Sequence, residues 1–125
     1  MGIAKSIVFA SALQIRSTVR TLAVVAALTC FSAQAGEGAG TVANLIVRDS
    51  DGLVYVQLAT PPTSRASCAA TTTYWMIQNE NSDSGKRLYA VLLAAHVAGR
   101  NVIIQGKNTC ARWGDGEDIL YVLMQ

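Results

Sequence analysis

Hydrophobic and polar positions alternate over short segments along most of this chain, and one segment follows a helical spacing instead. Residues 82–98 place apolar side chains at intervals of three and four, which predicts an amphipathic helix. Asn81 or Ser82 can cap its start with a side-chain oxygen, and Gly99 can end it in the left-handed conformation. The segment is apolar around most of its predicted circumference. Its main face comprises Leu88, Val91, Leu92 and Ala95.

Five other segments have the alternation or the β-branched and aromatic content of strands. The turn at residues 49–52 joins the first two as a hairpin, and Pro61-Pro62 ends the second because proline cannot donate to a β-ladder. Residues 36–40, Gly-Glu-Gly-Ala-Gly, precede the first strand and are expected to be flexible. The predicted strands are residues 41–48, 53–60, 72–79, 101–107 and 119–124.

The order of these elements is three strands, one helix and two strands. It predicts a mostly β domain with the five-stranded barrel of the OB-fold, in which a helix lies between strands three and four. There the helix plugs one end of the barrel, which is consistent with its broad apolar surface. The alternative is an open antiparallel sheet with one packed helix.

The first 35 residues have the pattern of a secretory signal peptide. Three basic residues precede the apolar run 21–31, and Ala33-Gln34-Ala35 is a small-x-small cleavage site, so we expect cleavage after Ala35. The apolar run is shorter than the about 20 residues that a membrane-spanning helix needs, so no membrane anchor is expected after cleavage. The alternative is a lipoprotein signal with Cys30 as the acylated residue, although Thr29 before it is a poor match.

Removal of the leader changes the charge of the chain. Three of the ten Lys and Arg residues lie in the leader, so the domain at 36–125 keeps seven of them against eight Asp and Glu, a net charge of −1. Its basic residues are scattered among acids, and phosphate backbones are bound by concentrated positive charge. Nucleic acid is therefore disfavoured as a partner. Ninety residues are enough for one small domain with a marginal core.

Two cysteines remain in the domain, Cys68 and Cys110. In a chain bound for the periplasm or the exterior, a cysteine pair in a small domain predicts a disulfide. The alternative is two buried free thiols.

Catalytic and metal signatures are weak in this sequence. The one histidine, His96, has Leu92 and Arg100 at the positions four residues away, where a second ligand on the same helix face would stand. Serine and threonine hydroxyls occur without a G-x-S-x-G elbow. We therefore predict neither a catalytic residue nor a metal or other cofactor, and interpret His96 as a helix-end cation or a buried neutral side chain.

The loop at 112–118 holds the candidate binding residues. Its acids, Asp115, Glu117 and Asp118, suggest either a calcium site, although the EF-hand pattern is absent, or a solvated turn paired with nearby cations. Arg112 and Trp113 are residue types enriched in recognition surfaces, although Trp113 can equally cover the barrel end. Trp75 is interpreted as a core residue. The predicted binding residues are Arg112, Trp113, Asp115 and Glu117.

Several short motifs occur together in the domain, and they carry a resemblance. They are Cys68, Trp75-Met76-Ile77, Glu80-Asn81-Ser82, Gly85-Lys86, the Ala-rich helix, Gly99, Thr109-Cys110-Ala111-Arg112-Trp113 and Asp115-Gly116-Glu117-Asp118. This combination resembles a family of small uncharacterised exported bacterial proteins. More distantly, the layout is similar to the OB-fold B subunits of pentameric bacterial toxins of the subtilase-cytotoxin and pertussis type. That second resemblance covers only topology, export and a disulfide. It implies that the protein can form a homo-oligomer.

We therefore expect an exported, non-enzymatic binding module that recognises a glycan or a protein partner and resembles a toxin B subunit. The alternative is a small periplasmic enzyme, or an enzyme inhibitor, that uses the loop from Arg112 to Asp118.

Overall fold

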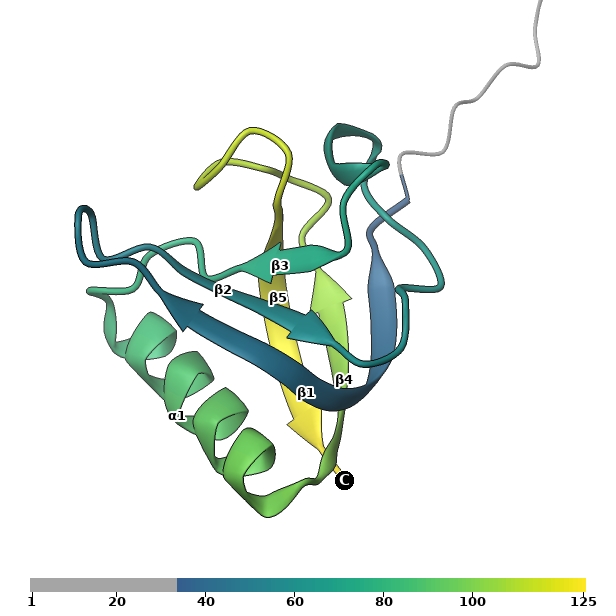
Figure 1. The fold of residues 1–125 in the computed structure, drawn as a ribbon. Coiled ribbons are helices and arrows are strands. Elements are labelled where there is room, and N and C mark those ends of the chain that lie inside the picture. Colours follow the sequence, from purple (N-terminus) through teal and green to yellow (C-terminus); the bar gives the residue numbers. More distant parts are fainter. Residues whose placement is uncertain (1–33) are drawn as a thin grey trace, which may run out of the picture. The chain divides into compact units, whose positions relative to one another are not determined.

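The computed structural model describes residues 34–125, and the predicted leader up to Ala33, Cys30 included, lies outside the described residues. The described part contains five strands, one α-helix and one short 3₁₀ turn. Figure 1 shows their arrangement. They are β1 (Glu37–Val47), β2 (Val54–Leu58), η1 (Ser67–Ala69), β3 (Tyr74–Met76), α1 (Asp83–Ala98), β4 (Asn101–Gly106) and β5 (Glu117–Met124).

The strands form a closed barrel in the order β1-β2-β3-β5-β4. The pair β3–β5 is parallel and the other four pairs are antiparallel. This is the mostly β, OB-fold-like barrel that the element order predicts, with the helix between strands three and four. The alternative of an open sheet is wrong, because each of the five strands pairs with two neighbours and the sheet has no free edge.

Strand β1 starts earlier than predicted, and the expectation that residues 36–40 are flexible is wrong. Residues 37–41 pair with β4 and thereby close the barrel, whereas 42–47 pair with β2. Glycine allows this approach: a Cβ on Gly38 would lie 3.3 Å from the ring of Trp75, and Gly40 has φ +152°, which other residues rarely adopt. A register shift between Val42 and Asn44 adds a bulge at the bend.

Helix α1 begins and ends as predicted. The Ser82 hydroxyl accepts a hydrogen bond from the backbone N–H of Gly85 at 3.0 Å, and Gly99 ends the helix with φ +61°. The helix packs against β1, β4 and β5. Its buried face is narrower than expected, since Leu93 is 41% and Val97 80% exposed. Within residues 34–125, no helix has the length and apolar character needed to cross a membrane.

One hydrophobic core fills the barrel, and it confirms Trp75 as a core residue. The Trp75 side chain is fully buried, together with Leu92 of the helix. The core is formed by Val42, Val54, Val56, Trp75, Ile77, Leu92, Ala95, Val102, Ile104 and Ile119.

Cys68 and Cys110 form a disulfide, as predicted, with 6.3 Å between their Cα atoms. The alternative of two free thiols is therefore wrong. Cys68 lies in η1, within the connection between β2 and β3, and Cys110 lies in the loop between β4 and β5. The bridge joins these two connections, which Figure 1 shows at the same end of the barrel.

Candidate functional site

A hollow of about 230 Å³ lies on the outside of the barrel. The turn between β1 and β2, the strands β2 and β3, and the loop between β4 and β5 all contribute to it. We call it the aromatic hollow because three of its six lining residues are aromatic. It is lined by Arg48, Leu53, Tyr55, Tyr74, Met76 and Trp113.

The two tyrosines come from neighbouring strands. Alternation along β3 places Trp75 in the core and Tyr74 on the outer face, and alternation along β2 does the same for Val56 and Tyr55. The Tyr55 and Tyr74 ring centroids lie 5.6 Å apart, and the ring planes are tilted by 60°. This tilted geometry is favourable for an aromatic pair, so the two rings hold each other in place.

Asp115 fixes the orientation of the Tyr74 phenol by accepting its hydrogen bond. Burial, together with this hydrogen bond, raises the pKa of Tyr74 to about 12. Tyr74 therefore stays neutral at physiological pH and donates to the carboxylate. The main chain of Asp115 is also held, because its carbonyl accepts from the Thr72 hydroxyl at 2.6 Å.

Trp113 also lines the hollow, and it is 44% exposed. The Arg48 guanidinium lies over its ring, with 4.6 Å between Cζ and the ring centroid. Arg48 also donates to both carboxylate oxygens of Asp51, at 2.8 Å and 2.6 Å. The hydrogen bonds from Arg48 hold the pKa of Asp51 well below its usual range, so Asp51 stays charged. The positive charge beside Trp113 is thus compensated.

Arg112 joins three segments around the hollow. Its Nε donates to Glu80 Oε1 at 2.8 Å, and its Nη2 donates to the carbonyl of Asp51 at 3.1 Å. Nη2 also lies 3.7 Å from the Asp51 carboxylate. Arg112 therefore holds the β4–β5 loop against the β1–β2 turn and the start of the helical region, and its charge is engaged by two acids.

The structure corrects the interpretation of Glu117 and Asp118 as part of an exposed acidic cluster. Both carboxylates are fully buried at the start of β5, whereas Asp115 is exposed. Asp118 accepts from the backbone N–H of Ala111 at 2.7 Å and of Arg112 at 3.2 Å, and from the Thr109 hydroxyl at 2.8 Å. Asp118 thus shapes the loop that carries Trp113.

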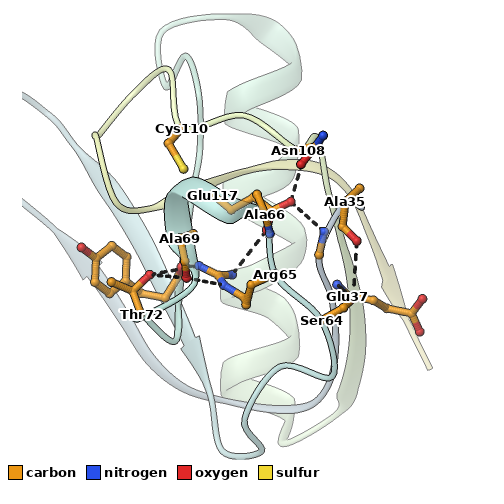
Figure 2. Close-up of polar contacts among 12 residues, drawn as sticks. Ala35, Glu37, Ser64, Arg65, Ala66, Ala69, Thr72, Asn108, Cys110 and Glu117 are labelled. Atoms are coloured by element: carbon orange, nitrogen blue, oxygen red, sulfur yellow. Dashed lines mark hydrogen bonds and ion pairs between the residues drawn. The ribbon is translucent and has the colours of Figure 1, made fainter. Parts of the chain in front are cut away.

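Glu117 is the centre of a second polar network, which Figure 2 shows. Its Oε1 accepts from the backbone N–H groups of Gly36 at 2.8 Å and Asn108 at 3.1 Å, and its Oε2 accepts from Ala66 at 2.8 Å. The Arg65 guanidinium stacks on the ring of Trp75 at 4.2 Å, with its Nη1 4.0 Å from Glu117 Oε2. The prediction of Glu117 as a surface binding residue is therefore wrong, because its oxygens face the barrel's own backbone.

His96 is exposed at the end of α1, and its Nδ1 lies 2.8 Å from the carbonyl oxygen of Val42. A carbonyl only accepts, so Nδ1 donates this hydrogen bond and links the helix to β1. Among residues 34–125, no group of three or more His, Cys, Asp or Glu side chains is arranged to hold a metal ion.

Of the four predicted binding residues, Trp113 lines the hollow, and Asp115 borders it through Tyr74. Arg112 does not line the hollow but anchors the β4–β5 loop to Glu80, and Glu117 is buried inside the barrel. The predicted set did not include five other residues that line the hollow, Arg48, Leu53, Tyr55, Tyr74 and Met76. Strand alternation in the sequence indicates that the two tyrosines point outward. It does not indicate that the β1–β2 turn and the β4–β5 loop meet beside them.

Comparisons with models of protein families, with curated proteins and with solved structures found no match to this chain. The two resemblances noted from the sequence therefore stay predictions.

Proposed function

We propose that this protein is an exported, non-enzymatic binding module that recognises a glycan in the aromatic hollow. The observation that supports the proposal best is the position of the hollow. It lies on the face formed by β2 and β3, between the β1–β2 turn and the β4–β5 loop. Barrels with this strand order bind oligosaccharides or oligonucleotides at that place.

The chemistry of the hollow favours an uncharged glycan over a nucleic acid. Three aromatic rings offer apolar faces to the C–H groups of a sugar ring, and the Tyr74 hydroxyl and Asp115 offer polar groups at the margin. Both nearby guanidinium groups are already paired, Arg48 with Asp51 and Arg112 with Glu80. Little uncompensated positive charge remains to neutralise phosphates.

Location in the periplasm or outside the cell is part of this proposal. The Cys68–Cys110 disulfide is compatible with an oxidising compartment. The signal-peptide pattern of residues 1–35 favours the same compartment.

A glycan array probed with the exported protein is the primary test. The array should yield a defined set of glycans, and Trp113→Ala should weaken binding by about tenfold or more, the loss expected for an interface hot spot. Tyr121→Ala is the matched control, because Tyr121 is 48% exposed on β5, outside the lining of the hollow. This control should bind like the unmodified protein.

Two results would contradict the proposal. One is an array without any bound glycan while a protein is captured from extract in a Trp113-dependent manner, which would make the partner a protein. The other is an equal effect of both substitutions. Light scattering of the exported protein would measure its oligomeric state. A closed oligomer would favour a module like the toxin B subunits, and a monomer would favour a single partner.

A further inference from the structure

The predicted leader cleavage site coincides with a buried polar site in the barrel. Cleavage after Ala35 makes Gly36 the first residue of the domain. The nitrogen of Gly36 lies 2.8 Å from Glu117 Oε1, and both residues are buried. We infer that Glu117 is the receptor for the α-ammonium group created at Gly36 by removal of the leader, so that processing places a buried ion pair in the barrel.

The surroundings of Glu117 fit a cationic partner at this position. A buried carboxylate is costly unless it is paired with positive charge. Arg65 approaches only Oε2, at 4.0 Å, and its Nη2 donates instead to the carbonyl of Tyr74 at 2.6 Å. The nitrogen that faces Oε1 most closely is that of Gly36, ahead of Asn108 at 3.1 Å. Cleavage turns this closest donor from an amide into an ammonium.

The site is also shaped for glycine at this position. A Cβ on Gly36 would lie 2.3 Å from Glu117 Oε2, and 2.9 Å from both the carbonyl oxygen of Ser64 and the ring of Trp75. The carbonyl of Gly36 is held as well, by the backbone N–H of Gly106 at 2.8 Å and by the Gln105 side chain at 3.0 Å. Gly36 is thus fixed at both of its backbone polar groups.

The covalent step is a hydrolysis. Water, activated by a leader peptidase, adds to the carbonyl carbon of Ala35, the C–N bond to Gly36 breaks, and the products are a carboxylate on Ala35 and a protonated amine on Gly36. In the folded chain this peptide bond is shielded from a peptidase, because the Ala35 carbonyl accepts from the Ser64 hydroxyl at 3.4 Å and Gly36 is buried. Cleavage therefore precedes closure of the barrel by residues 37–41, and the new ammonium docks as β1 pairs with β4.

The full chain, expressed with its leader in an exporting bacterial host, tests this inference. Intact mass and N-terminal sequencing should show that the product starts at Gly36. Its α-amine should react with an amine reagent at least about tenfold more slowly in the native than in the unfolded protein, because each unit of upward pKa shift reduces the free amine about tenfold. Peptide mapping separates this amine from those of Lys86 and Lys107.

Glu117→Gln should remove most of this protection, whereas Glu37→Gln should leave it unchanged. The second variant is a matched control, because Glu37 is an exposed acid one residue from the new terminus. If Glu117→Gln does not fold, the pKa of the α-amine, measured in the unmodified protein, tests the inference instead. We expect Glu117 to raise this pKa above its ordinary value near 8, against the opposing effects of burial and of Arg65, while the nearby β4 residues Gln105 and Gly106 are neutral.

Three outcomes would overturn the inference: a product that starts elsewhere than Gly36, an α-amine that reacts equally fast in the native and unfolded states, or an unshifted pKa of that amine. None of these measurements involves a ligand of the aromatic hollow, so failure here and failure of glycan binding are separate results.

Discussion

Opening the Cys68–Cys110 disulfide is expected to remove a large part of the stability of this domain. The two cysteines are 42 residues apart, and the loop that they close contains β3, α1 and β4. In the chain-entropy description, a cross-link over a loop of this length destabilises the unfolded state by about 4 kcal/mol. Reduction restores that entropy to the unfolded chain.

This amount is large for a domain of this size. At roughly 0.05–0.15 kcal/mol per residue, a domain spanning residues 36–125 has a free energy of unfolding of about 5–13 kcal/mol. For such domains, 1 kcal/mol corresponds to about 4–8 °C in melting temperature. Opening the disulfide is therefore expected to lower the melting temperature by about 15 °C or more.

Thermal unfolding of the purified protein, followed by circular dichroism with and without a thiol reductant, measures this effect. The Cys68→Ser/Cys110→Ser double variant should melt like the reduced protein, which controls for other actions of the reductant. Below the melting temperature the variant should keep ligand binding, because Asp118 and Arg112 hold the β4–β5 loop independently of the bridge. Equal melting temperatures before and after reduction would refute the entropic reasoning.

Three further perturbations have defined outcomes. Leu92→Ala should lower the free energy of unfolding, measured in urea, by about 2–5 kcal/mol, because Leu92 is fully buried. Leu93→Ala, at a 41% exposed position on the same helix, should change it by no more than about 0.5 kcal/mol. Equal changes would contradict the assignment of the core face. Ser82→Ala should cost about 1 kcal/mol by the same measurement, through loss of the helix cap. The Tyr74 phenol should titrate near pH 12 in phenolate absorbance, and Asp115→Asn should lower this value toward 10. Since the pKa is raised in the folded state, the small associated stability is present below about pH 10 and is lost as the pH rises through 12. An unchanged titration in the variant would contradict the hydrogen bond.

The features that could be predicted from the sequence are those with local causes. The cap at Ser82, the left-handed residue Gly99 and the apolar spacing between them all act within the helix itself. The barrel followed from the order of the elements, and the disulfide from the cysteine count and the compartment that the leader pattern predicts. Each of these inferences needs no knowledge of which distant segments meet.

The features that could not be predicted depend on such meetings. Residues 36–40 resemble a flexible terminus in isolation, but in the barrel their glycines allow β1 to pass close to the ring of Trp75 and to close the sheet against β4. Glu117 and Asp118 resemble a solvated turn in the sequence, because the folded chain alone brings their donors together: Glu117 accepts from the distant Ala66, and Asp118 accepts from Ala111 through the curvature of its own loop. Charged residues are almost never buried without partners, and local sequence does not show the partners.

The first two residues of β5 link the N-terminal segment of the domain to the aromatic hollow. Successive side chains of a strand point to opposite faces, so Glu117 turns toward the N-terminal segment while Asp118 turns toward the loop that carries Trp113. Both residues also pair with β3, whose Tyr74 and Met76 line the aromatic hollow. An ammonium docked on Glu117 would therefore stabilise the same strand start from which Asp118 orders the loop that carries Trp113. A loop that is ordered before binding lowers the entropic cost of capturing a ligand. This matters here because a hollow of about 230 Å³ can make only a few contacts with a ligand to offset that cost.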